Sequence, residues 1–127
     1  MTGTEIFSHS EMLEKTGNKE KAYVLLYKKG SEQSDCSLKN LSEVDAGEIE
    51  KNVFLADVSE VRDIHTHYGV TSVPTMLEFE NGKFTNVLKG CHESGFYKSL
   101  FENAVYSAKM KDNAEKLQKR VPVYSTP

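Results

Sequence analysis

The sequence contains no tryptophan, three prolines and only two cysteines among its 127 residues. Two cysteines are too few for a disulfide-rich scaffold, and Cys36 and Cys91 are spaced unlike zinc ligands. Neither sign of charge is in large excess, since 16 basic and 19 acidic residues give a formal net charge of −3. This balance does not favour binding to nucleic acid or anionic lipid. We therefore expect a protein of the reducing cytoplasm that does not bind nucleic acid.

Long apolar segments are missing as well. The stretch over 1–17 has polar residues at every second or third position, so it lacks the apolar core of a secretory signal. No other window reaches the apolar length of a membrane-spanning helix, and no membrane partner is expected. What is present is a globular composition, 38% hydrophobic and 28% charged, in a length that suits one domain.

The hydrophobic pattern predicts alternating helices and strands around a mixed sheet. The expected elements are a helix over 6–16, a strand over 21–27, a helix from Ser34 or Asp35 through Val44, a strand over 52–58, a short helix over 59–68, strands over 75–80 and 83–88, and a last helix from about 94 to 117. The order strand, helix, strand over 21–58 implies parallel pairing. The dipeptide Asn81-Gly82 predicts a type I′ hairpin between the last two strands.

The two helices nearest the N-terminus have several candidate caps. In the first helix we expect Ser8 or Ser10 at the N-cap and Ile6, Met12 and Leu13 on the inward face. A second helix starting after Ser34 or Asp35 would place Cys36 close to its N-terminus.

A thiol at a helix N-terminus is pushed toward the thiolate by the helix dipole. Asp35 opposes this effect on Cys36, and Lys39 partly offsets Asp35. The alternative is that Cys36 is a buried, inert cysteine that only fills space beneath the loop.

The run Tyr68-Gly-Val-Thr-Ser-Val-Pro-Thr75, followed by a strand and a turn, resembles the segment around the cis-proline of the thioredoxin family. The resemblance covers roughly residues 5 to 108 and implies a thioredoxin-like, three-layer α/β sandwich with a central mixed sheet. It implies that Pro74 follows a cis peptide bond and that the Val73 backbone binds an extended peptide or glutathione. Gly90 would lie in the loop that faces Pro74.

The sequence departs from that family where the family carries Cys-x-x-Cys. The loop here reads Gln33-Ser34-Asp35-Cys36, so Cys36 falls on the second cysteine and Gln33 replaces the attacking one. In an alternative alignment Cys36 is the first cysteine, and Lys39 replaces the second. In either alignment the two-thiol loop and the tryptophan before it are missing, and Tyr27 stands where active members have a buried acid. Ordinary thioredoxin activity is therefore not expected.

Cys91 follows the glycine of the loop that faces the cis-proline, so the resemblance places it on the rim of the substrate groove. It would then be either a resolving partner for Cys36 or the target of a neighbouring glutaredoxin domain. A disulfide between Cys36 and Cys91 requires Cα atoms within about 7 Å. A charged His92 turned toward the sulfur would favour the Cys91 thiolate. The alternative is that Cys91 is a passive loop residue.

Three histidines raise the question of a metal site, but the pattern does not favour one. His65 and His67 are two positions apart on a predicted helix and so point to different faces, and His92 lies far along the chain. We expect solvated histidines, no metal and no cofactor.

The last residues carry a second resemblance. The segment Val121-Pro-Val-Tyr-Ser-Thr-Pro127 is similar to the first strand of a glutaredoxin, where a Thr-Pro step leads into the catalytic motif. We therefore expect a thioredoxin-like domain over 1–108, a basic helix end or linker over 109–120, and over 121–127 the start of a glutaredoxin domain whose remainder is cut off. A native tail that matches by chance is the alternative for 121–127. The basic run over 109–120 could meet an acidic partner, but Asp112 and Glu115 interrupt it, so we expect a solvated helix end there.

Together these patterns predict an atypical thioredoxin-like module for thiol–disulfide exchange or redox relay, acting beside a glutaredoxin domain. Its reactive residues would be Cys36 and Cys91, and its partners protein thiols or disulfides and glutathione. The alternative is a redox-inactive module that keeps the groove and binds other proteins. A third hypothesis is a stress-related or co-chaperone partner that docks on other proteins.

Overall fold

The computed structural model describes the backbone of residues 1–120 and the side chains of residues 1–106 and 110. The predicted linker side chains over 111–120 and the predicted glutaredoxin start over 121–127 lie outside these described residues. The elements, in chain order, are β1 (Thr4–Glu5), α1 (His9–Thr16), β2 (Lys21–Tyr27), α2 (Glu32–Ser42), the 3₁₀ helix η1 (Gly47–Asn52), β3 (Val53–Asp57), α3 (Asp63–His67), β4 (Thr75–Glu80), β5 (Lys83–Lys89) and α4 (Ser94–Arg120).

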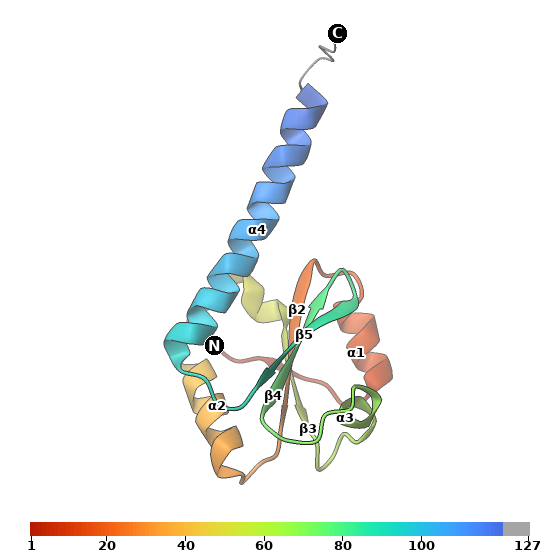
Figure 1. The fold of residues 1–127 in the computed structure, drawn as a ribbon, viewed down its shortest axis with the longest axis vertical. Helices are drawn as coiled ribbons and strands as arrows, with labels where there is room; N and C mark the ends of the chain where they lie inside the picture. Colours follow the sequence, from red (N-terminus) through yellow and green to blue (C-terminus); the bar gives the residue numbers. More distant parts are fainter. Residues whose placement is uncertain (121–127) are drawn as a thin grey trace.

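The five strands form one open mixed sheet with the order β1-β3-β2-β4-β5 (Figure 1). β2 pairs in parallel with β3, as the sequence predicts, and its other neighbour is β4, which runs antiparallel to it. The hairpin is also confirmed, since β4 and β5 are joined by Asn81 and Gly82 with φ of 52° and 80°. Both values lie in the left-handed region that a type I′ turn requires.

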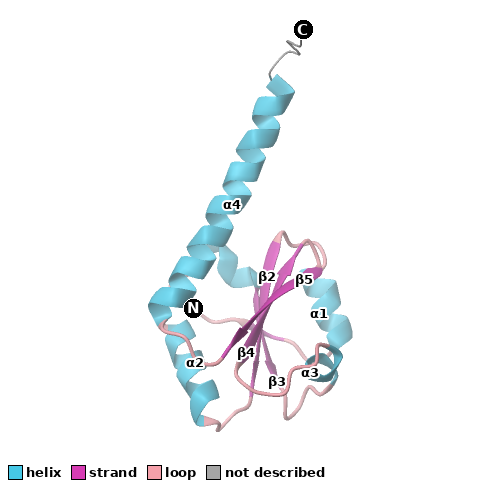
Figure 2. Cartoon of the chain, viewed as in Figure 1, coloured by secondary structure: helices cyan, strands magenta, loops and turns pink. Residues whose placement is uncertain are grey.

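Helices cover both faces of this sheet, which gives the predicted three layers (Figure 2). Alternate residues of β2 point to opposite faces, so Val24 packs in the cluster under α1 and α3, whereas Tyr23 packs in the cluster under α2, η1 and α4. β2 is therefore the buried centre of the sheet, as its continuous apolar run predicts. The C-terminal part of α4 extends past the sheet (Figure 1). Among the described helices, none combines the length and apolar character needed to cross a bilayer.

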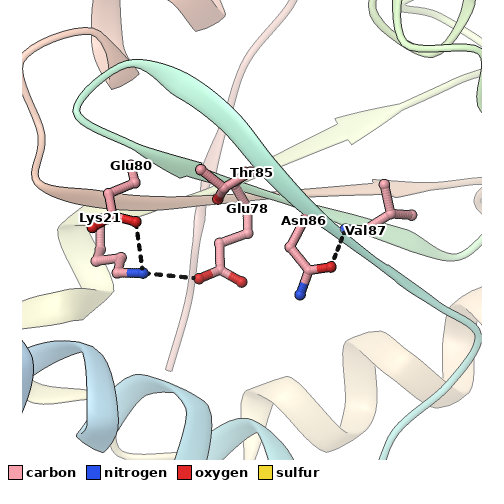
Figure 3. A network of polar contacts seen from close by, with 6 residues as sticks. All are labelled: Lys21, Glu78, Glu80, Thr85, Asn86 and Val87. Carbon is pink, nitrogen blue, oxygen red and sulfur yellow. Dashed lines mark hydrogen bonds and ion pairs between the residues drawn. The ribbon is translucent and has the colours of Figure 1, made fainter.

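Lys21, the first residue of β2, forms ion pairs that link β2 to β4 (Figure 3). Its Nζ lies 3.2 Å from Glu78 Oε1 and 3.5 Å from Glu80 Oε2. Lys21 pairs directly with Glu80 across β2 and β4, so the ion pairs stabilise the antiparallel register.

Several predicted boundaries are wrong for local reasons. α1 begins at His9 rather than at residue 6, because Ser8 is its N-cap, which confirms one of the two predicted caps. Ile6 and Met12 are buried as predicted, whereas Leu13 is 46% exposed. α3 begins at Asp63 rather than at residue 59, because the Asp57 carboxylate accepts hydrogen bonds from Ser59 and holds a turn there.

The start of α2 is also wrong in the sequence prediction. The helix begins at Glu32 after the N-cap residue Ser31, and not after Ser34 or Asp35. Ser34 is buried inside the first turn, where its Oγ accepts a hydrogen bond from the Lys28 amide. Cys36 consequently lies in the second turn. Since the dipole effect falls off within the first turn, the predicted activation of Cys36 by the helix N-terminus does not apply.

Candidate thiol–disulfide site

The structure joins Cys36 and Cys91 in a disulfide, with their Cα atoms 5.9 Å apart. The bond connects the second turn of α2 to the loop between β5 and α4, across 55 positions of sequence. Both cysteines are partly exposed. The pairing that the sequence left open is therefore present, and neither cysteine is an isolated thiol.

The loop that carries Cys91 is held against the proline segment. The Gly90 amide donates a hydrogen bond to the Pro74 carbonyl oxygen over 2.9 Å. The Val73–Pro74 peptide bond is cis, Pro74 is buried and Val73 is partly exposed. The structure thus brings Val73, Pro74, Gly90 and Cys91 to one edge of the molecule, at the start of β4 and the end of β5.

The three residues before Cys36 form the first turn of α2. Gln33 and Asp35 are exposed, whereas the hydroxyl of Ser34 is buried and bonded to the backbone. Gln33, which one of the two alignments suggested by the resemblance equates with the attacking cysteine, is thus on the surface. An amide cannot attack a disulfide, so any exchange at this edge depends on Cys36 and Cys91.

Three side chains around the disulfide carried no signal in the sequence. Asn40 Nδ2 donates to the His92 carbonyl oxygen at 2.9 Å and lies 3.4 Å from Cys91 Sγ. The Tyr97 hydroxyl is buried, with Ser37 Oγ at 2.7 Å, and accepts from the His92 amide at 3.3 Å. These contacts fasten the Cys91 loop to α2 and α4.

The third is Phe96, an aromatic side chain that lies beside the disulfide loop and is 41% exposed. Its ring stacks on the His92 imidazole, with centroids 4.4 Å apart. His92 Nε2 lies 3.0 Å from the Lys89 carbonyl oxygen. This contact and the stacking orient the imidazole toward Lys89 and Phe96.

Tyr27, which the family resemblance places where active members have a buried acid, donates a hydrogen bond to Glu5 Oε1 over 2.7 Å. Burial, and then Glu5, raise the pKa of Tyr27, so its hydroxyl stays protonated at neutral pH. The neighbouring carboxylate of Asp57 contributes to this rise in the pKa of Tyr27. The pKa of Asp57 itself is lowered, because hydrogen bonds from Ser59 outweigh the opposing effect of burial. Tyr27 is therefore a structural donor and not a proton acceptor.

A groove of about 430 Å³ runs beside the proline segment. Its wall includes the partly exposed Val73 and the basic side chains of Lys28 and Arg62. The remaining lining residues are Val58, Ser59, His65, Val70, Thr71 and Ser72. The groove offers apolar and cationic surface next to the segment that the family resemblance assigns to peptide or glutathione binding.

The histidines considered as metal ligands, His65, His67 and His92, are not grouped into a metal site in the described part of the chain. Instead the His67 ring lies against that of His9, with ring centroids 4.1 Å apart and ring planes tilted by 30°. In the part of the chain that the structure describes, no three His, Cys, Asp or Glu side chains are grouped so that they could hold a metal ion.

Neither the protein-family models nor the curated proteins compared with the sequence give a match. Solved structures do. The chain is similar to a mutant thioredoxin from Halobacterium salinarum, with 20% identity, a TM-score of 0.70 and coverage of 80% of this chain and 89% of the other. It is also similar to Plasmodium falciparum thioredoxin, with 20% identity, a TM-score of 0.68 and coverage of 79% of this chain and 97% of the other.

Oxidised mitochondrial thioredoxin 3 from Saccharomyces cerevisiae is similar too, with 18% identity, a TM-score of 0.67 and coverage of 76% of this chain and 92% of the other. At these identities the likeness shows the fold alone. The mixed five-stranded sheet, the helices on both faces and these structural neighbours agree: the chain has a thioredoxin-like fold.

Proposed function

We propose that the protein takes part in thiol–disulfide exchange, with Cys36 and Cys91 as its reactive pair. The observation that carries the proposal is the disulfide between α2 and the Cys91 loop, next to the Pro74 segment. Both sulfurs belong to partly exposed residues at an edge of the molecule, where a second thiol can approach.

The reaction needs only these two sulfurs and a partner that carries two thiols. A partner thiolate attacks one sulfur of the disulfide, the Cys36–Cys91 bond breaks, and the other cysteine leaves as a thiolate. A second partner thiolate then attacks the mixed disulfide and releases the protein with both cysteines reduced. Two electrons pass to the protein, the partner gains a disulfide, and the cysteine thiolates take protons from water. In reverse, the reduced protein reduces a partner disulfide.

The surface around the disulfide supports protein thiols, protein disulfides and glutathione as partners. The partly exposed Val73 lines the groove, and Lys28 and Arg62 supply positive charge for a carboxylate. Phe96 supplies an exposed aromatic surface next to the Cys91 loop, in a chain that has no tryptophan to form such a surface.

The compartment and the attached domain remain part of this proposal. In the reducing cytoplasm expected from the composition, protein disulfides are usually transient and catalytic, which agrees with an exchanging pair. The resemblance of residues 121–127 to a glutaredoxin strand supports a relay with a glutaredoxin domain. An open reading frame that encodes a glutaredoxin motif after Pro127 would support the relay, and a stop codon there would remove it.

A structural role for the disulfide is the second candidate, with the domain acting as a redox-inactive binding module. It is favoured by the position of Cys36 in the second turn of α2, away from the helix N-terminus that activates thiols. A cross-link that closes a loop of 55 residues can stabilise the fold by about 4 kcal/mol.

The two functions differ in how the folded, oxidised chain reacts with a dithiol peptide. Samples are quenched with alkylating agent over time and weighed by intact-mass spectrometry. Exchange predicts that the chain gains two alkyl groups while the peptide loses two hydrogens, at denaturant concentrations where the chain stays folded. The double variant Cys36→Ser/Cys91→Ser is the control and should leave the peptide reduced. A disulfide that yields only after unfolding would support the structural role.

A further inference from the structure

Asn40 touches both sulfurs of the disulfide and the backbone of the Cys91 loop. Its Nδ2 lies 2.9 Å from the His92 carbonyl oxygen, 3.4 Å from Cys91 Sγ and 3.8 Å from Cys36 Sγ. Asn40 follows Cys36 by one helical turn, so it shares a face of α2 with that cysteine. The side chain is partly buried, which keeps its amide close to the sulfurs.

The two hydrogens of this amide have separate tasks. One forms the short bond to the His92 carbonyl oxygen and fixes the side chain to the residue that follows Cys91. The other is available to the sulfurs, and the nearer of them is Cys91 Sγ. Because this bond ties the amide to the Cys91 loop, we expect the donor to stay beside Cys91 Sγ when the disulfide opens, although Asn40 itself belongs to α2.

The sulfur contact gains strength when the disulfide breaks. A disulfide sulfur is a weak acceptor, whereas a thiolate is a charged one, and hydrogen bonds to charged groups are stronger than neutral ones. An amide N–H that is already in place therefore stabilises the thiolate more than the disulfide. Thiols that form a thiolate more readily also leave faster in exchange.

From this geometry we propose that Asn40 makes Cys91 the leaving sulfur, so that the partner thiolate attacks Cys36. The inference rests on the exchange function proposed above. The partner S–Cys36 bond forms, the Cys36–Cys91 bond breaks, and the electron pair of the broken bond stays on Cys91 Sγ beside the Asn40 amide. The mixed disulfide is then on α2, next to the exposed first turn with Gln33.

Alkylation of single thiols tests the electrostatic half of the proposal. The full chain is made with Cys36→Ser, which leaves the Cys91 thiol, or with Cys91→Ser, which leaves the Cys36 thiol. Each is made with and without Asn40→Ala, and the iodoacetamide rate is measured from pH 5 to 10. Asn40→Ala should raise the pH midpoint of Cys91 alkylation by about one unit and slow alkylation at pH 7 about threefold, since the lost thiolate is partly offset by higher nucleophilicity.

Two internal controls separate this role from a loss of packing. The Cys36 midpoint should move much less than the Cys91 midpoint, because the amide is anchored on the Cys91 side. Ser42→Ala, which removes an exposed hydroxyl from the same helix, should move neither midpoint. Asn40→Ser, which is too short to reach the His92 carbonyl oxygen, should behave like Asn40→Ala and serves if that variant is poorly folded. Equal shifts of the two cysteines, or none, would overturn the proposal.

Mapping the mixed disulfide tests the directional half. The oxidised wild-type chain is mixed with reduced glutathione, quenched with acid within the first turnover and digested. Glutathione should be found on Cys36, and Asn40→Ala should slow its appearance about threefold or more. Glutathione found mainly on Cys91 would overturn this inference alone, while exchange at either cysteine would leave the proposed function standing. The complete absence of exchange in the wild-type chain would overturn both.

Discussion

The amide of Gly90 donates a hydrogen bond to the carbonyl oxygen of Pro74 over 2.9 Å. It continues the β4–β5 ladder, whose terminal pair is Thr75 and Lys89, and holds the next residue, Cys91, beside the proline segment. The position of one half of the disulfide is thus set by strand register, and the other half by the turn of α2 that carries Cys36.

Gly90 should tolerate a side chain poorly for conformational reasons alone. Its φ is +84°, and an added Cβ would meet no atom within 4 Å. Gly90→Ala should therefore destabilise the oxidised chain by about 1 kcal/mol, the cost of a left-handed conformation. Gly95→Ala is the matched control, since Gly95 is also open but lies in α4 without a positive φ, and it should be neutral or slightly stabilising. Urea unfolding measures both, and equal losses would contradict the explanation.

The buried hydrogen bond between Ser37 and Tyr97 should stabilise the packing of α2 against α4. The two hydroxyl oxygens lie 2.7 Å apart, and both side chains are fully buried. Tyr97→Phe should cost about 1–2 kcal/mol because it leaves the Ser37 hydroxyl and the His92 amide without this partner. Ser37→Ala should cost less, since the Tyr97 hydroxyl keeps the His92 contact. A double-mutant cycle in urea should give a coupling near 1 kcal/mol, and additive losses would argue against the bond.

Stability should fall as the pH drops from 7 to 5, in part through His9. Burial and the neighbouring His67 lower the pKa of His9, and Asp63 opposes them more weakly. Because the unfolded chain then takes up a proton more readily, stability is lost as the pH falls through the ordinary histidine value of about 6.5. His9→Gln should flatten this slope.

Other groups with lowered pKa values, Glu11 and Asp57, lose their contribution only at lower pH, so Glu11→Gln should leave the profile above pH 5 unchanged. Urea midpoints measured every half pH unit decide the matter. An unaltered slope in His9→Gln would show that His9 does not contribute to it.

Phe96 should matter for protein partners more than for small thiols. It is 41% exposed beside the disulfide loop, whereas Phe84 is 42% exposed on β5 and packs against Tyr68 and Phe79. Phe96→Ala should slow exchange with a protein dithiol about threefold to tenfold, the effect expected when about one to two fewer methylene-sized groups are buried against the partner. The rate with dithiothreitol should be nearly unchanged, because this small dithiol has no surface to pack against Phe96. Phe84→Ala should leave both rates unchanged. Equal effects of the two variants would exclude a docking role for Phe96.

Much of the fold follows from local patterns in the sequence. β2 and β3 are continuous apolar runs, and Asn81-Gly82 fixes the hairpin, so these elements could be predicted closely. The start of α2 could not, because Ser31, Ser34 and Asp35 are all good N-cap residues, and the hydroxyl of Ser34 accepts from the Lys28 amide instead of capping the helix. β1 has two residues, too few to produce a pattern.

The candidate site was predictable only in part. The Pro74 segment and the Cys91 loop are marked by a family pattern, but the pairing of two cysteines 55 positions apart depends on how α2 packs against the end of β5. Asn40 carries no local signal, since a polar residue on a helix is ordinarily solvated. Its role emerges only from the contact with the His92 backbone.

The most direct test of the account is a redox titration of the folded full chain in glutathione buffers, with quenched samples weighed by intact mass. The account predicts a reversible interconversion between the disulfide and the dithiol, with a midpoint more oxidising than about −300 mV, in the range of exchanging disulfides. A Cys36–Cys91 disulfide that stays closed at every glutathione ratio until the chain unfolds would contradict it.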